Sequence, residues 1–116
     1  MKGEIDAAIA AHGTWKSKLK AAIESGVLPD IASAGADNFC AFGKWLNSTQ
    51  HTGADAVHHA TVQQLHTEFH RTIAGVLRDL QAGRISSAEK AIGLGTAFAG
   101  ASAKLTMAML AWKKAA

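Results

Sequence analysis

Hydrophobic residues recur every three or four positions along most of the chain, which is the spacing that lines one face of an α-helix. Over residues 3–25 this face consists of Ile5, Ile9, His12, Trp15, Leu19 and Ile23. Gly26 is a suitable C-cap, and Pro29 prevents the helix from simply continuing. The pattern therefore predicts a first helix over residues 3–25. A connector with a short helical turn at residues 30–34 is expected after it.

Two further helices are predicted in the middle of the chain. Asp37 is a good N-cap for a shorter helix through the segment NFCAFGKWLNS. After a loop over residues 49–53, a long helix that Thr52 or Asp55 can cap runs to just before Gly83. The apolar positions of the shorter helix are Phe39, Phe42, Trp45 and Leu46. Those of the long helix are Val62, Leu65, Phe69, Ile73, Val76, Leu77 and Leu80.

The last helix is predicted to begin at a capping box formed by Ser86 and Glu89. Its apolar face consists of Ile92, Phe98, Leu105, Met109 and Trp112. Three long helices, one shorter helix and short connections indicate an all-α antiparallel four-helix bundle with a short extra helical turn. Abundant alanine, one proline and few β-branched residues agree with this fold class. The 116 residues show no internal repeat and suit one domain over residues 1–116.

Charge and hydropathy narrow the possible partners. The formal charge of +3 is too small to indicate a nucleic-acid-binding protein, and Lys16, Lys18 and Lys20 spread around their helix instead of forming one stripe. The most apolar segment, AIGLGTAFAGASAKLTMAMLAW, contains Lys104, so we expect a bundle helix and not a membrane span. The polar N-terminus is no secretory signal, and the single cysteine excludes an internal disulfide. A cytoplasmic protein is expected.

His66 and His70 are four residues apart, so their side chains project from one helix face and can grip a single metal ion. His12 lies on the apolar stripe of the first helix, and Cys40 lies between two phenylalanines. Taken alone, His12 could be an ordinary core histidine and Cys40 a small buried hydrophobic residue. When the four residues are considered together, binding to one shared ion would offset the cost of burying all four polar groups. A soft thiolate with three imidazoles suits tetrahedral zinc.

The motifs HxxW, CxFGKW and HxxxH, in this order, resemble those of the chemoreceptor zinc-binding domain, usually called CZB. The resemblance implies a bundle that holds zinc through three histidines and one cysteine, which here correspond to His12, Cys40, His66 and His70. Domains of this family are attached to bacterial chemoreceptors and diguanylate cyclases, often as homodimers, and are associated with sensing zinc and hypochlorous acid. The resemblance therefore implies a sensory role in chemotaxis or cyclic-di-GMP control.

Four protein ligands leave no open position for a catalytic water, so no enzyme is expected. A di-iron site would need Glu-x-x-His pairs, and Glu68 precedes His70 by only two residues. Oxidation of Cys40, or loss of zinc from it, could release one of the four ligands and so signal to an attached domain. The alternative is a structural zinc that staples a dimerising bundle. A third possibility is an interaction bundle without metal.

The remaining histidines, His51, His58 and His59, are expected at the surface. His59 shares a face with His66, but seven residues of helix separate them by roughly 10 Å, too far for one ion. A weak second metal site at these residues is the alternative. Trp15 and Trp45 can wall the zinc site or belong to the core.

Overall fold

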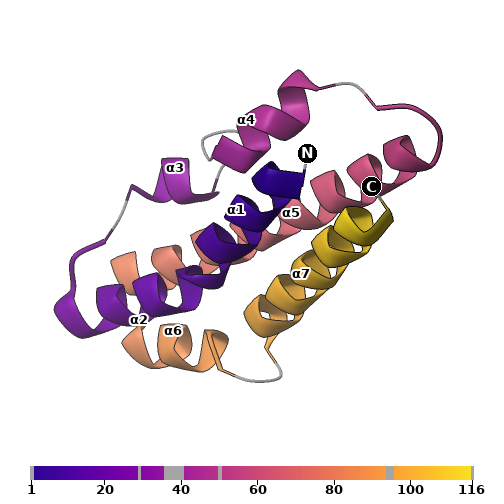
Figure 1. Ribbon diagram of the computed structural model, residues 1–116. Helices are drawn as coiled ribbons and strands as arrows, with labels where there is room; N and C mark the ends of the chain where they lie inside the picture. Colours follow the sequence, from indigo (N-terminus) through magenta and orange to yellow (C-terminus); the bar gives the residue numbers. More distant parts are fainter. Residues whose placement is uncertain (1, 29, 36–40, 50, 94–95, 116) are drawn as a thin grey trace.

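The computed structural model describes residues 2–28, 30–35, 41–49, 51–93 and 96–115, and its regular elements are all helices (Figure 1). The prediction of an all-α fold is therefore confirmed. The helices are α1 (Lys2–Gly13), α2 (Trp15–Ser25), α3 (Ile31–Gly35), α4 (Ala41–Ser48), α5 (Gly53–Gln81), α6 (Ile85–Ala91) and α7 (Ala97–Ala115).

The main helices alternate in direction, as the sequence predicts for an antiparallel bundle. Helices α1 and α2 follow one another along the same side of the molecule, α4 returns, α5 runs the full length, and α7 returns against it (Figure 1). The resulting body is elongated, with extents of 46 × 26 × 19 Å. Helix α3 packs on α5, and α6 packs on α2 and α5 at the lower end.

The core lies between α1, α2, α5 and α7, and every predicted apolar stripe faces it. The hydrophobic residues of these stripes with less than a tenth of their surface exposed are Ile5, Leu19, Phe42, Leu46, Val62, Phe69, Ile73, Val76, Leu77, Ile92, Phe98, Leu105, Met109 and Trp112. The rings of Phe69 in α5 and Phe98 in α7 lie 5.7 Å apart, so aromatic packing joins the two longest helices. This core holds α5 fixed, and α5 carries two of the predicted metal ligands.

The first helix is not continuous, contrary to the prediction for residues 3–25. It divides into α1 and α2 at Thr14. The Thr14 hydroxyl donates to the carbonyl of Ala11 at 2.7 Å, and the Thr14 N–H donates to the same carbonyl at 3.4 Å. Both bonds span three residues and therefore tighten the turn locally, which interrupts the α-helical ladder without changing which face is buried.

The last predicted helix is also divided, into α6 and α7, and its predicted capping box is wrong. Helix α6 begins at Ile85 with Arg84 at the N-cap position, and no side chain caps it. Ser86 is therefore already inside the helix. The chain enters α6 from a tight turn in which Gly83 has a φ of 81° and the Arg84 N–H donates to the carbonyl of Asp79 at 2.8 Å. This bond satisfies a carbonyl at the end of α5, and the turn directs the chain into α6 without a side-chain cap.

Other predicted helix ends agree with the structure. Gly26 adopts a left-handed conformation and its N–H donates to Ala22, as expected of a C-cap. Thr52 occupies the N-cap position of α5 but makes no side-chain capping bond. The predicted turn at residues 30–34 is α3, displaced by one residue. The N-cap prediction for Asp37 lies outside the described residues.

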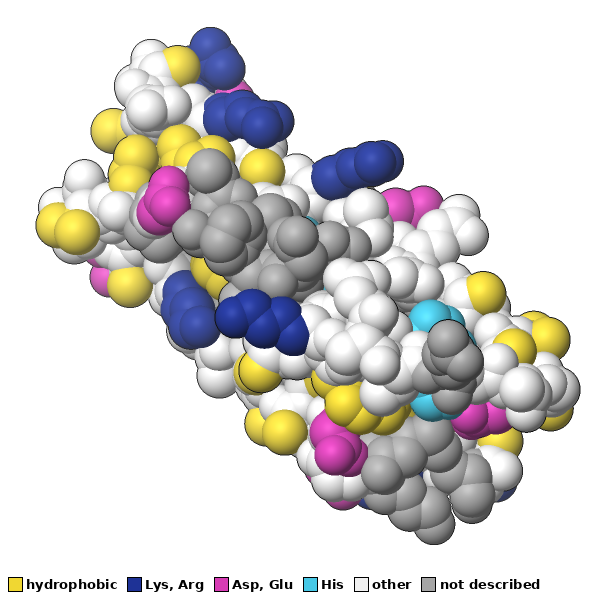
Figure 2. Space-filling model, turned by 90° about the horizontal axis from the view of Figure 1, so that it is seen from above, with side chains coloured by type: hydrophobic (Ala, Val, Ile, Leu, Met, Phe, Trp, Pro, Cys, Tyr) yellow, Lys and Arg dark blue, Asp and Glu magenta, His cyan; other side chains and the backbone are white. Residues whose placement is uncertain are grey.

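The surface is chemically mixed. In the view of Figure 2, Lys and Arg side chains occupy several separate places, and Asp and Glu side chains lie elsewhere on the same face. Among the described residues, no helix combines the length and the apolar character that crossing a bilayer requires.

Candidate metal centre

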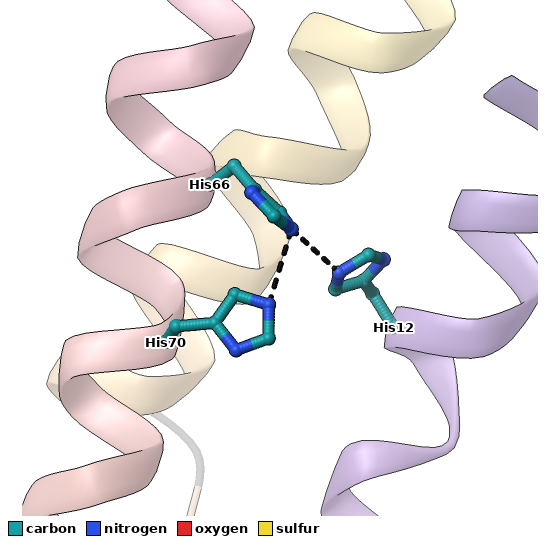
Figure 3. A group of neighbouring side chains, drawn as sticks. All are labelled: His12, His66 and His70. Atoms are coloured by element: carbon teal, nitrogen blue, oxygen red, sulfur yellow. Dashed lines mark hydrogen bonds between the residues drawn. The ribbon is translucent and has the colours of Figure 1, made fainter. Parts of the chain in front are cut away.

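Three of the four predicted ligands meet in the core. His66 and His70 project from one face of α5 toward His12, which reaches them from α1 (Figure 3). Nε2 of His66 lies 3.0 Å from Nε2 of His12 and 3.1 Å from Nε2 of His70. The ligand atoms of all three residues lie within 4.8 Å of one another.

The opposite ring nitrogens of His12 and His70 are tied to the backbone. Nδ1–H of His12 donates to the carbonyl of Ala8 at 2.7 Å, one turn earlier in α1. Nδ1–H of His70 donates at 2.7 Å to the carbonyl of Ala34, in the last turn of α3. A carbonyl can only accept, so the proton of each neutral ring is on Nδ1 and the lone pair of Nε2 is directed toward the cluster. In metal sites, the ring nitrogen that does not bind the metal commonly makes such a hydrogen bond, and the bond orients the histidine.

Burial disfavours a positive charge in the cluster. His66 is completely buried, and His12 and His70 are 6% and 2% exposed. Desolvation, together with the neighbouring rings of His70 and His12, lowers the pKa of His66 to about 3. Desolvation likewise lowers the pKa of His12, although the hydrogen bond to Ala8 opposes this shift. Burial therefore favours the neutral form of His66 and of His12, the state in which imidazole binds a metal.

The donor set fits a metal ion. At a Zn–N distance of 2.0–2.1 Å, tetrahedral geometry separates two ligand nitrogens by about 3.3 Å, close to the two short Nε2 separations. In the absence of a metal, the single proton available on Nε2 of His66 would be shared between two acceptors. A cation placed among the three nitrogens accepts all of their lone pairs at once.

The fourth predicted ligand, Cys40, lies outside the described residues. The described residues on either side of that segment both contact the cluster. The carbonyl of Ala34 accepts the hydrogen bond from His70, and the ring centroid of Phe42 lies 5.4 Å from that of His66 and 6.0 Å from that of His12. Both neighbouring parts of the chain therefore reach the three imidazoles.

The two predicted wall residues differ in position. Trp15 adjoins the cluster, with its ring 6.4 Å from that of His70. Trp45 instead stacks on Phe42 at 5.7 Å, so it is one ring removed from the histidines. Both tryptophans pack against the buried core.

The groups that orient two of the three histidines could not be predicted from the sequence. The carbonyls of Ala8 and Ala34 have no side-chain signature, so no motif could identify them. The glycine at position 35 is the sequence feature that relates to this contact. A Cβ atom at this position would lie 2.7 Å from Cβ of Ala74 in α5. The missing side chain allows α3 to approach α5 closely enough for the carbonyl of Ala34 to reach His70.

The prediction that His51 and His59 are surface residues is wrong, because both are partly buried where the α4–α5 loop and α5 meet α7. Their rings stack at 4.6 Å, and each lies within 6 Å of the ring of Trp112. Nδ1 of His51 bonds to the carboxylate of Asp55, and Nε2–H of His59 donates to the carbonyl of Leu46 at 2.8 Å. These side chains thus fasten the α4–α5 loop to the end of the bundle.

A family model described as the chemoreceptor zinc-binding domain matches residues 12–77, which is 66 of the 116 residues. The chain belongs to the chemoreceptor zinc-binding domain family. The CZB match begins at His12 and includes Cys40, His66 and His70. It confirms the resemblance seen in the motifs, and it makes this chain a member of a regulatory, zinc-binding family. No similar curated protein and no similar solved structure was found.

Proposed function

We propose that this CZB domain binds one zinc ion through His12, Cys40, His66 and His70. The observation that carries this proposal is the convergence of the Nε2 atoms of three buried imidazoles in the core. In His12 and His70, backbone carbonyls accept the Nδ1 proton, so that Nε2 carries a lone pair. We propose zinc as the metal because the family is described as zinc-binding.

Cys40 is proposed as the fourth ligand because it completes the tetrahedron with a soft donor. It precedes Ala41, the first residue of α4, and α4 contacts both histidine-bearing helices. A thiolate together with three neutral imidazoles leaves a site of net charge +1 around a divalent ion. All four positions would be filled by the protein, so we propose a regulatory and not a catalytic centre.

We propose that the site senses zinc, oxidants or both. Zinc keeps Cys40 as a thiolate, the form that oxidants attack. A two-electron oxidant such as hypochlorous acid would transfer its oxygen to the sulfur, yielding a sulfenic acid and chloride. The weakened Zn–S bond would release the start of α4. The alternative remains a structural zinc that staples a dimerisation bundle.

In the cell, the proposed role is signal transduction in the bacterial cytoplasm. The domain would act as a homodimer that passes its state to a covalently attached or associated chemoreceptor or diguanylate cyclase. Family membership supports this assignment, since the description names chemoreceptors.

Elemental analysis of the purified protein and of two matched histidine variants tests the proposal. The wild-type chain should contain one zinc per chain, and His66→Ala should lose most of it because Nε2 of His66 is central to the cluster. His59→Ala is the control: it removes a partly buried histidine of the same helix that is outside the cluster. Equal zinc content in all three proteins would contradict the proposed site.

A further inference from the structure

The aromatic side chains of α4 connect the histidine cluster to the last turn of α7. We propose that α4 is a relay in which Phe42 senses occupancy of the metal site and Trp45 transmits it to Trp112. This inference rests on the proposed zinc site and adds the route by which its state leaves the core. The matched CZB region ends at residue 77, before α7 begins.

The first step of the relay is the contact of Phe42 with the proposed ligands. Its ring meets those of His66 and His12 edge-on, with interplanar angles of 86° and 73°. Phe42 is 5% exposed and belongs to the core. Because packed rings cannot interpenetrate, a change in the positions of the histidines must move Phe42 or be resisted by it.

The second step lies within α4. Trp45 follows Phe42 by three residues, so both side chains share a helix face, and their rings stack at 5.7 Å and 22°. The proposed ligand Cys40 immediately precedes this helix, which has only eight residues. Gain or loss of a ligand bond at its start would therefore displace Phe42 and Trp45 together.

The third step crosses to α7. The ring of Trp45 lies 5.6 Å from that of Trp112, which is completely buried in the last two turns of α7. Nε1–H of Trp112 donates to the carboxylate of Asp55 at 2.6 Å, and the neighbouring Lys113 pairs with Asp6 of α1 at 2.6 Å. The contacts of Trp112 and Lys113 thus attach the end of α7 to α1, α4 and α5.

Helix α4 also has space to move. A pocket of about 340 Å³ lies between parts of α4, α1 and α2, and its walls include Ala8, His12, Trp15, Phe42 and Trp45. The rings of Phe42 and Trp45 therefore do not pack against α1 at every point. Helix α5, which bears His66 and His70, contributes none of the residues that line this pocket.

Nuclear magnetic resonance of the tryptophan indole groups tests the relay. The three tryptophans give three Nε1–H signals, and the Trp112→Phe variant identifies that of Trp112. Adding zinc to the metal-free protein should displace the Trp112 signal. In Trp45→Leu the displacement should fall by roughly threefold or more, while zinc still binds one per chain. Trp15→Phe, which alters a ring beside His70 and not beside Trp112, should retain the full displacement.

Each outcome separates the relay from the zinc site. If wild-type protein binds zinc and the Trp112 signal stays unchanged, the relay is wrong and the zinc site stands. The same conclusion follows if Trp45→Leu binds zinc and keeps the whole displacement. If no zinc binds, both proposals fail. Should Trp45→Leu not fold, hydrogen exchange of the wild-type protein decides: zinc should slow exchange of the last amides of α7, and unchanged exchange overturns the relay.

Discussion

At the scale of single residues, the cluster depends on where the protons are. His12 and His70 each commit one ring nitrogen to a backbone carbonyl, which directs the lone pair of the other nitrogen toward the cluster. The backbone therefore selects the tautomer before any metal arrives. The cost is that burial disfavours a charge on these rings, since desolvation lowers the pKa of His66 and that of His12.

The metal-free domain should therefore lose stability in mild acid. The pKa of His66 falls from 6.5 to about 3 in the folded state, so below pH 6.5 the unfolded chain binds a proton that the folded chain excludes. Unfolding free energy should be constant above pH 6.5 and fall as pH drops from there toward 3. For His66 alone the loss between pH 7 and pH 5 is about 2 kcal/mol.

Urea titrations of the chelator-treated protein at several pH values would measure this dependence. His66→Leu is the comparison, because it removes the titrating group from the same buried position. The variant should show a shallower loss of stability between pH 7 and pH 5. Identical slopes for the two proteins would contradict a neutral, buried His66.

At the scale of elements, close packing of α3 on α5 positions the proposed ligand His70. Gly35 lies against Ala74, and the adjacent carbonyl of Ala34 accepts the bond from His70. A methyl group at Gly35 has no space, because its nearest neighbour is the short side chain of Ala74 and cannot rotate away. One small residue thus determines how near a helix end approaches the cluster.

The variant Gly35→Ala should push α3 away from α5, destabilise the fold by about 1–3 kcal/mol and weaken zinc binding. Gly75→Ala is the matched control. It lies in α5, one residue after Ala74, and a Cβ atom there meets nothing within 4 Å. This control should stabilise the protein by about 0.5–1 kcal/mol through helix propensity and leave zinc affinity unchanged. Thermal unfolding and zinc titration of both variants measure the difference, and similar behaviour would contradict this role of Gly35.

The sequence predicted helices well where a single apolar stripe and a terminal glycine act together, as in α5. The predicted helix boundaries were wrong at Thr14 and at the start of α6. Local hydrogen bonds, from Thr14 to Ala11 and from Arg84 to Asp79, change the course of the backbone at these two places. Such bonds depend on local backbone geometry, so hydrophobic periodicity does not reveal them. His51 and His59 were misplaced for a related reason, because their partners come from α4, α5 and α7.

At the scale of the whole molecule, the three histidines come from two helices that belong to different legs of the bundle. Their spacing predicted a shared site, since His66 and His70 lie one turn apart and His12 lies on an inward stripe. The distances and the carbonyl partners required the folded chain. A metal at this junction would link α1 to α5 and would bind only the folded state.

Zinc should therefore stabilise the domain. Binding to the native state alone adds about 4 kcal/mol when free zinc exceeds the dissociation constant a thousandfold. A sensor predicts that chelation causes a local, reversible change near α4, while a structural staple predicts that it unfolds the bundle. Circular dichroism with hydrogen exchange, before and after chelation, distinguishes them. Equal stability with and without zinc would contradict metal binding at the core.

The most direct test of the central claim is X-ray absorption spectroscopy of the zinc-loaded protein at the zinc edge. The account predicts one sulfur ligand at about 2.3 Å and three nitrogen ligands at about 2.0–2.1 Å. In Cys40→Ser the sulfur contribution should vanish. A wild-type spectrum with nitrogen and oxygen ligands alone, or with more than one sulfur, would contradict a centre built from His12, Cys40, His66 and His70.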